Sequence, residues 1–250
     1  METYGEVHRV LVTYMRAVRT VPADVLARKA AILARHFELD ASDPRKLTHE
    51  LVSTVNVQIG RLGFRIDAVH DQRTNALHYV FVNARSDEYI QSCTAYSAPE
   101  LDVIKQLVDS VVCAHRYAYS VLYAMAKQRA TAVLKQKTSD AVYLLRRLVD
   151  DGWIEVTSLD RVVLSALCLA ELRTYLDDKY GFMTAADPLG KLLWCIVCEE
   201  MVTVGRKCGG DECYAAFHNK CFGVYLHRHV ECPNAGCSIS LQDSVVVGPE

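Results

Sequence analysis

The sequence predicts a mainly α fold with small β hairpins, followed by a small cysteine-rich module. Apolar residues recur three or four positions apart along most of the chain before residue 180, and two short stretches change to a strand-like alternation. Seven of the ten cysteines lie between residues 195 and 237. With 250 residues, 51% of them hydrophobic, the chain is long enough for two or three folded domains.

Three helices are predicted before residue 63. In the first, the apolar positions at helical spacing are Val7, Val10, Leu11, Tyr14 and Val18. The second begins after Pro22, since proline is favoured at helix starts, and its apolar positions are Val25, Leu26, Ile32, Leu33 and Phe37. The third follows Asp43-Pro44 and ends at Gly63, with an apolar face of Leu47, Leu51, Val55, Ile59 and Leu62.

A β hairpin is predicted next, because the apolar period falls to two. Phe64, Ile66 and Ala68 alternate with other residues, a polar turn covers 71–75, and the alternation resumes at Leu77, Tyr79 and Phe81. Three helices closed by a hairpin is the order of a winged-helix domain. We therefore predict one over residues 1–90.

The pattern repeats over residues 97–183, which predicts a second winged-helix domain. Ser97 and Glu100 have the spacing of a capping box, and the helix behind them carries Leu101, Ile104, Leu107, Val108 and Val111. A shorter apolar segment surrounds Val121, Leu122 and Met125. A helix from Thr138 with Ala141, Leu144, Leu145, Leu148 and Val149 follows, then strands over 153–156 and 161–164 and a helix through Leu169, Leu172 and Leu176. Residues 184–190 resemble a linker.

The clustered cysteines and one histidine are spaced as ligands of two zinc ions. They are Cys195, Cys198, Cys208, Cys213, His218, Cys221, Cys232 and Cys237. Zinc takes four Cys or His ligands in a tetrahedron, so these eight serve two ions with none left over. A segment of about 45 residues is also close to the size at which a hydrophobic core alone fails. Bound metal would then supply the missing stability.

A disulfide framework is the alternative, and the odd number of clustered cysteines disfavours it. The chain begins without the basic start and apolar core of an export signal, and it has no apolar stretch long enough to predict a membrane span. We expect an intracellular, reducing compartment, where clustered cysteines are more often metal-bound. Cys93, Cys113 and Cys168 stand apart from the cluster and are interpreted as small buried apolar residues.

The stretch 115–148 is basic in a chain of net charge −2. Against the single acid Asp140 it has Arg116, Lys127, Arg129, Lys135, Lys137, Arg146 and Arg147. A solvated helical face explains this excess, and so does contact with an acidic protein or weak, non-specific contact with DNA phosphates. The helices placed to enter a DNA groove, 44–62 and 139–151, lack a run of base-contacting Asn, Gln and Arg, so sequence-specific binding is not expected.

Two kinds of module have ligands of this order in a cross-braced arrangement. RING domains bind ubiquitin-conjugating enzymes, and PHD fingers bind histone tails. In both, ligand pairs one and three share one ion while pairs two and four share the other. This pairing assigns Cys195, Cys198, His218 and Cys221 to one zinc and Cys208, Cys213, Cys232 and Cys237 to the second. The ligand order alone leaves both kinds open.

Two further features favour a RING-like domain over residues 191–240. The ten residues between Cys221 and Cys232 are few for a PHD finger, and Val230 stands where such a finger usually has tryptophan. Ile196 and Pro233 follow the first and seventh ligands, at positions that RING domains use against the conjugating enzyme. The fold class predicted for the whole chain is therefore tandem winged-helix domains followed by a cross-braced two-zinc RING-like domain.

Several segments together carry a family resemblance. They are Trp153-Ile after a basic-tailed helix, Glu171-Leu-Arg-Thr-Tyr-Leu-Asp-Asp-Lys-Tyr180, and Leu193-Trp-Cys-Ile-Val-Cys198 with the six ligands that continue it. With the tandem helical pattern they resemble the first non-SMC element of the structural-maintenance-of-chromosomes five-six complex. This resemblance implies a nuclear DNA-repair subunit that pairs with a MAGE-domain subunit through its winged helices. It also implies contact with a kleisin subunit and support of ubiquitin transfer by the RING-like end.

The sequence departs from that family at two places. The Cys208 to Cys213 and Cys232 to Cys237 intervals are wider than the usual two-residue knuckles, so the second zinc loop is expected to be reshaped. Ser238 follows the last ligand, where active RING domains often have Arg or another large residue that holds the ubiquitin thioester.

The resulting functional prediction is a RING-type ubiquitin transferase whose activity is weak or depends on a partner. Such a ligase orients the charged conjugating enzyme and forms no covalent intermediate, so no catalytic residue is predicted. The alternative is a structural adaptor without transfer activity, which Ser238 favours. A PHD-type histone reader is the third interpretation, with Trp194, Phe217 and Tyr225 as the rings available for an aromatic cage.

Overall fold

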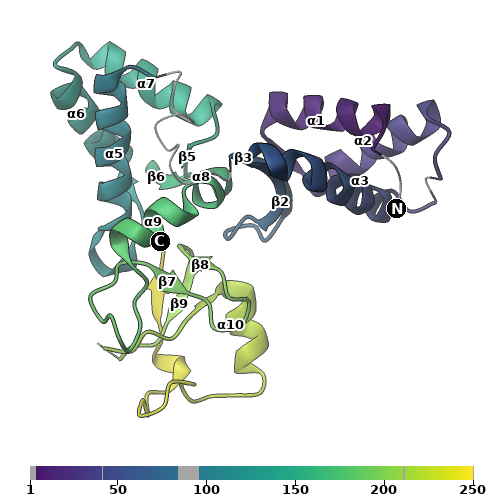
Figure 1. The fold of residues 1–250 in the computed structure, drawn as a ribbon. Coiled ribbons are helices and arrows are strands. Elements are labelled where there is room, and N and C mark those ends of the chain that lie inside the picture. The colour runs from purple at the N-terminus through teal and green to yellow at the C-terminus, as the bar shows by residue number, and fades with distance from the viewer. Residues whose placement is uncertain (1–3, 41, 84–95, 211, 250) are drawn as a thin grey trace. The chain divides into compact units, whose positions relative to one another are not determined.

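The computed structural model describes residues 4–40, 42–83, 96–210 and 212–249, and helices dominate these ranges (Figure 1). None of the helices in these ranges is long and apolar enough to cross a membrane. By their internal contacts the residues form two compact units. The first comprises the residues up to 88 together with 166–171, and the second comprises 89–165 and 172–250. The three predicted domain ranges stay predictions.

The first unit contains the three helices and the hairpin that the sequence predicts. Its elements are α1 (Glu6–Val18), β1 (Thr20–Pro22), α2 (Ala23–His36), α3 (Pro44–Ile59), the 3-10 turn η1 (Gly60–Leu62), β2 (Phe64–His70), β3 (Leu77–Asn83) and α8 (Ala166–Glu171). The Asp43 carboxylate caps α3 by accepting hydrogen bonds from the amides of Arg45 and Lys46 at 2.9 and 3.1 Å. Gly63 ends this region with a φ of 81°, in the left-handed conformation that glycine adopts without strain.

The buried faces of these helices differ in part from the predicted ones. In α1 the buried residues are Val7, His8, Leu11 and Met15, whereas Val10 and Val18 are exposed. Val10 lies off this stripe, and Val18 is the last residue of the helix. Ile32 is exposed because it lies on the opposite side of α2 from the buried Leu26, Ala27, Ala30 and Ala34. Leu62 is exposed in η1, beyond the end of α3.

The sheet of the first unit has the strand order β1-β3-β2, and it is buried on both sides of β3. Tyr79 and Phe81 join the core formed with the helices. Val80 and Val82 face the other way and pack with Leu167 of α8. Arg19 and Glu171 form an ion pair that also ties α8 to this unit. The sequence predicted neither the short strand β1 nor the covering of this second face.

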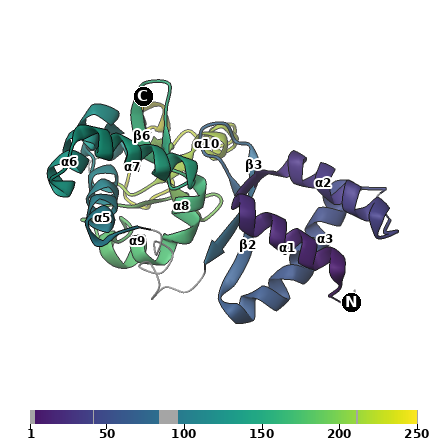
Figure 2. The ribbon, with the colours of Figure 1, turned by 90° about the horizontal axis from the view of Figure 1, so that it is seen from above.

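The helical part of the second unit repeats the same order of elements. It contains α5 (Ala98–Val112), the 3-10 turn η3 (His115–Tyr117), β4 (Val121–Leu122), α6 (Tyr123–Leu134), α7 (Thr138–Asp150), β5 (Ile154–Val156), β6 (Arg161–Leu164) and α9 (Arg173–Tyr180). The predicted capping box is present, since the Ser97 amide donates to the Glu100 carboxylate at 2.7 Å. The strand order is β4-β6-β5. Helices α5 and α6 contact β6, and α7 contacts β5. Figure 2 shows α6 next to α5 and α7. The winged-helix assignment of both repeats stays a prediction.

Helix α6 was predicted only as a short apolar segment. Its buried residues are Ala126 and Ala130, which are too small to give a strong apolar period. The larger apolar residues near its start, Leu122 and Met125, are exposed. The helix is therefore held by close packing of small residues against α5 and α7, with which it makes its main helical contacts.

The remaining elements of the second unit are short and belong to the cysteine-rich module. They are β7 (Leu193–Trp194), β8 (Met201–Val202), β9 (Gly205–Lys207), β10 (Ala216–His218), α10 (Asn219–Leu226), the 3-10 turn η4 (Leu241–Asp243) and β11 (Val245–Val247). One sheet pairs β7 with β8, and the other has the order β10-β9-β11. Both sheets are antiparallel.

The stretch 184–190, which resembles a linker in the sequence, is a loop between two segments that are hydrogen-bonded to each other. The Met183 amide donates to the Leu192 carbonyl at 2.8 Å, and the Lys191 amide donates to the Tyr180 carbonyl at 3.0 Å. The Tyr119 hydroxyl donates to the Lys191 carbonyl at 2.7 Å. The helical part of the second unit and the cysteine-rich module thus belong to one compact unit.

We predict that Leu51→Ala and Leu62→Ala affect stability very differently, although the sequence places both leucines on one helical face. Leu51 has no exposed side-chain area, and Leu62 is 64% exposed. Leu51→Ala should lower the free energy of unfolding by about 2–5 kcal/mol because it leaves a cavity. Leu62→Ala, the matched control, should change it by less than about 0.5 kcal/mol. Urea unfolding followed by circular dichroism measures both, and equal losses would contradict the described core.

Candidate metal centres

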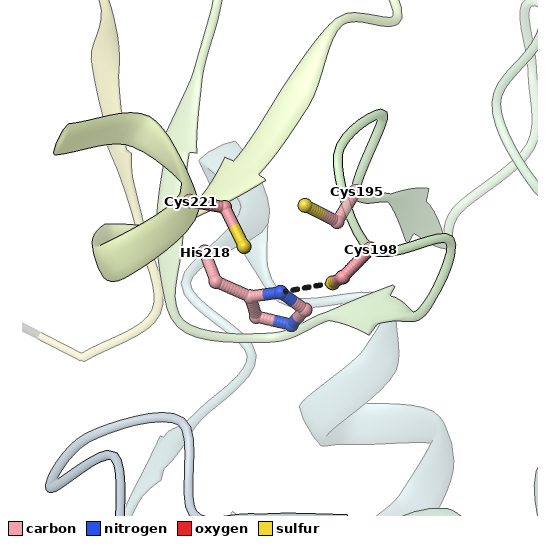
Figure 3. A group of neighbouring side chains, drawn as sticks. All are labelled: Cys195, Cys198, His218 and Cys221. Atoms are coloured by element: carbon pink, nitrogen blue, oxygen red, sulfur yellow. Dashed lines mark hydrogen bonds between the residues drawn. The ribbon is translucent and has the colours of Figure 1, made fainter. Parts of the chain in front are cut away.

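The first group of candidate metal ligands is Cys195, Cys198, His218 and Cys221, whose ligand atoms all lie within 4.8 Å of one another (Figure 3). Cys195 and Cys198 lie in the turn between β7 and β8, which is closed by hydrogen bonds from the Glu199 amide to the Cys195 carbonyl and from the Cys195 amide to the Glu200 carbonyl. His218 ends β10, and Cys221 is in the first turn of α10. Short elements thus bring together residues 23 positions apart.

Hydrogen bonding orients the His218 ring toward the sulfur atoms. Its Nε2 lies 3.0 Å from the Met201 carbonyl oxygen, so Nε2 carries the proton and donates. The lone pair of Nδ1 is then available to a metal ion. Nδ1 lies 3.2 Å from the Cys198 sulfur (Figure 3). A metal-binding histidine typically donates its second N–H to a backbone carbonyl in this way.

The thiols of the first group differ in their tendency to ionise. Burial of Cys195 opposes ionisation, but its interaction with the His218 side chain and hydrogen bonds from backbone amides outweigh it and lower the pKa of this thiol to about 6. Burial, together with the neighbouring Cys195, raises the pKa of Cys198 to about 12. A bound metal would displace the protons that these thiols retain.

The second group is Cys208, Cys213, Cys232 and Cys237, again with ligand atoms within 4.8 Å of one another. Cys208 follows β9, Cys213 precedes β10, and the other two come from the loop after α10. That loop is closed by hydrogen bonds from the Cys232 amide to the Ile239 carbonyl and from the Cys237 amide to the Asn234 carbonyl. The Asn234 side chain donates to the Cys213 sulfur at 3.1 Å.

The spacing of the sulfur atoms suits a tetrahedral metal ion better than a disulfide. Cys208 and Cys237 sulfurs are 3.7 Å apart, and Cys213 and Cys232 sulfurs are 3.5 Å apart. Four thiolates about 2.3 Å from one zinc would have sulfurs about 3.8 Å apart, whereas a disulfide bond is about 2.0 Å long. The seven cysteines of the two groups are all free thiols. The donor set and its spacing therefore fit two zinc ions.

The structure brings the eight predicted ligands together in the two groups that the cross-braced pairing specifies. The groups are interleaved along the chain, so β9 and β10 each link one group to the other. Close packing requires glycine at two positions that the sequence analysis did not single out. A Cβ on Gly205 would lie 1.9 Å from the Phe217 carbonyl oxygen, and one on Gly209 would lie 2.3 Å from the Asp243 carbonyl oxygen.

The two predicted contacts with a conjugating enzyme differ in exposure. Ile196 is half-buried, and its amide donates to the Ala216 carbonyl at 3.2 Å. Pro233 is exposed, as is Ser238 after the last ligand. The involvement of Ile196 and Pro233 in binding stays a prediction.

The rings considered for a histone-binding cage do not form an open one. Phe217 is fully buried and packs against Phe222 and Tyr225, with ring centroids 5.7 and 5.1 Å away. The Trp194 ring packs on Phe182 instead, with centroids 4.9 Å apart. Phe217 therefore belongs to the core of the module, which the apolar strand around it could have indicated.

The remaining candidate residues are placed as follows. Cys168 is buried as predicted, but the prediction for Cys113 was wrong, because this residue is exposed just after the end of α5. Cys93 lies outside the described residues. In the basic stretch 115–148, Arg147 pairs with Glu100 at 3.3 Å and Arg129 bonds to the Ser110 hydroxyl. The ion pair of Arg147 offsets one of the basic charges, and the hydrogen bond to Ser110 orients the Arg129 side chain.

Comparison with known proteins supplies the family. A model described as the Nse1 non-SMC component of the SMC5-6 complex matches residues 8–139, which is more than half of the chain. The chain belongs to the Nse1 family. A second model, described as a RING-like domain, matches residues 195–238 and so spans all eight ligands. The family resemblance seen in the sequence is confirmed.

Two relatives of this Nse1-family chain extend over nearly its whole length. The non-structural maintenance of chromosomes element 1 of Schizosaccharomyces pombe is 22% identical over 227 residues, covering 87% of this chain and 91% of the relative. A chain of a solved Nse1-Nse3-Nse4 complex superposes with a TM-score of 0.76 at 16% identity, covering 96% of this chain and 98% of that one. The fold described above is thus shared with the solved chain.

We predict that the purified protein contains two zinc ions per chain, since the eight ligands form two complete groups. Cys208→Ser should lower the zinc content toward one per chain, because it removes one of four ligands from the second group. Cys113→Ser is the matched control, as it removes an exposed cysteine outside both groups. Elemental analysis of the purified proteins measures this. A wild-type content below about 1.5 zinc per chain would contradict four ligands per ion.

Proposed function

We propose that this chain is a subunit of an SMC5-6 complex, and that the RING-like module of this chain holds two zinc ions and supports ubiquitin transfer. The observation that carries the proposal is the presence in one chain of an Nse1-family helical region and two complete Cys/His groups. Membership of this family supports a role in DNA repair and a place in the nucleus. Two structural zinc ions would fix the loops that the module offers to a partner.

The chemistry asked of such a module is orientation. All seven cysteines of the module are candidate metal ligands, so none of their thiols is left over to act as a nucleophile. A RING-type ligase increases the transfer rate by holding the charged conjugating enzyme in a productive arrangement. Ile196 and Pro233, each next to a ligand, are the residues proposed to contact that enzyme.

We predict that Ile196→Ala reduces ubiquitin discharge from a cognate charged conjugating enzyme by about 5- to 150-fold, the range for a central interface position. Zinc content should not change, since Ile196 is not a ligand. Leu189→Ala, which truncates a leucine that is 78% exposed in the loop 184–190, is the control and should leave the rate unchanged. Discharge assays with a panel of conjugating enzymes, with and without a MAGE-domain partner, test this.

Ser238 favours the second candidate function, a structural adaptor without transfer activity. It is exposed after the last ligand, and serine is too short to hold a thioester as a large residue would. Ser238→Arg should raise the discharge rate if the module is a ligase. Discharge that is absent in the wild type and in Ser238→Arg, even with the MAGE-domain partner present, would establish the adaptor interpretation.

The partners proposed for the helical region are a MAGE-domain subunit and a kleisin subunit. The superposition on a chain from an Nse1-Nse3-Nse4 complex supports this, as do apolar residues exposed at the end of α3 and the start of β2. Val57, Leu62 and Phe64 are 62%, 64% and 36% exposed there. Burial of such residues by a partner would be favourable.

We predict that Leu62→Asp weakens binding to a MAGE-domain protein by about tenfold or more, because a charge would be buried in an apolar contact. Leu189→Asp changes a leucine that is even more exposed and lies outside the helical region, and this variant should bind as the wild type does. Light scattering of the chains mixed at known concentrations measures the complex. Equal binding by both variants would place the contact elsewhere.

A further inference from the structure

One lysine of the module is buried next to a candidate metal ligand. Lys207 is 3% exposed and, among the described residues, is the only buried lysine or arginine. It is the last residue of β9, the central strand of its sheet, where it pairs in register with Ala216 on β10 and Val245 on β11. Lysine is rarely buried unless its surroundings compensate its charge.

The ammonium group of Lys207 holds the turn that carries the first ligand of the second group. Its Nζ donates to the carbonyl oxygens of Cys208 and Gly210 at 3.3 and 3.0 Å. These two carbonyl groups belong to the turn that begins at Cys208. The Gly210 carbonyl also accepts a hydrogen bond from the Cys213 amide at 3.2 Å, which links the second ligand to the same turn.

The charge of this group also suits the second metal centre. With a divalent zinc ion, four thiolates leave two net negative charges, whereas the first group, with three thiolates and a neutral histidine, leaves one. A buried cation one residue from Cys208 offsets part of the larger charge. In the first group Lys220 also directly precedes a ligand, Cys221, but that lysine is exposed.

Lys207 connects the second metal centre with the helical part of the same unit. Its Nζ lies 5.5 Å from the centroid of the Tyr117 ring, within the range of a cation–π interaction. Tyr117 is fixed in η3 by two further contacts. Its hydroxyl donates to the Met183 sulfur at 3.3 Å, and its carbonyl accepts from the Gly248 amide at 2.9 Å.

We propose that Lys207 is a positioning residue for the second zinc centre, held against the Tyr117 ring so that its ammonium fixes the 208–210 turn and offsets the charge of the four thiolates. This inference rests on the two zinc ions of the proposed function. Zinc retention at the second centre then depends on Tyr117, a residue of the helical region that is distant in sequence. Removal of such a second layer of contacts typically weakens metal binding by about 10- to 100-fold.

Release of zinc to excess EDTA, followed with a metal-sensitive dye on the full-length protein, tests the proposal. Lys207→Met keeps the apolar stem and removes the charge, and should release about one zinc per chain 10- to 100-fold faster while the other is released at the wild-type rate. Lys220→Met is the matched control and should behave as the wild type. Lys207→Arg retains the charge and should restore most of the retention, which a purely space-filling role would not require.

Changes at Tyr117 give an independent test that leaves the module's own sequence intact. Tyr117→Leu removes the ring and should speed release of the same single zinc, whereas Tyr117→Phe keeps the ring and should not. If Lys207→Met does not fold, the Tyr117 pair decides. The inference would be overturned if Lys207→Met released zinc at the wild-type rate, or if both ions were released equally faster. The role of charge would be overturned if Lys207→Arg released zinc as fast as Lys207→Met. A wild-type protein without zinc would instead overturn the metal assignment.

Discussion

The interleaving of the two ligand groups along the chain is the constraint on which the C-terminal module depends. Because neither group is contiguous, the strands β9 and β10 must hold the two groups at a fixed separation, and the short pairings around them serve that end. The same constraint requires glycine at positions 205 and 209, because a side chain on Gly205 or Gly209 would collide with backbone atoms. The fully buried Phe217 then fills the space between the sheet and α10.

The sequence predicted those features whose physical signal is local. Apolar periods located the helices and hairpins, Asp43 and Ser97 marked helix starts, and the ligand spacing predicted the two groups that the structure brings together. Helix faces were predicted less well, as the exposed Val10 and Ile32 show, because a period indicates that a face is apolar but not where tertiary packing will centre the buried stripe.

Other features could not be predicted, because they arise from contacts between residues distant in sequence. The strands β1 and β4 are too short to show an alternation, and each forms only by pairing with the second strand of the following hairpin. The position of Lys207 next to a ligand does not predict its burial, since Lys220 also directly precedes a ligand cysteine and is exposed. The two helical repeats nevertheless share the same strand order, so one architectural solution is used twice.

The assignment of α8 to the first unit has a consequence for biosynthesis. The chain is made from its N-terminus, and domains usually fold as they emerge from the ribosome. Here the face of β3 formed by Val80 and Val82 is covered by a helix that follows α5, α6, α7 and the hairpin of β5 and β6. The first unit is synthesised first, but it cannot finish folding until α8 has been made. Its nascent sheet stays exposed until residue 171 has been translated, and during that interval a chaperone or a partner subunit would find an uncovered apolar surface.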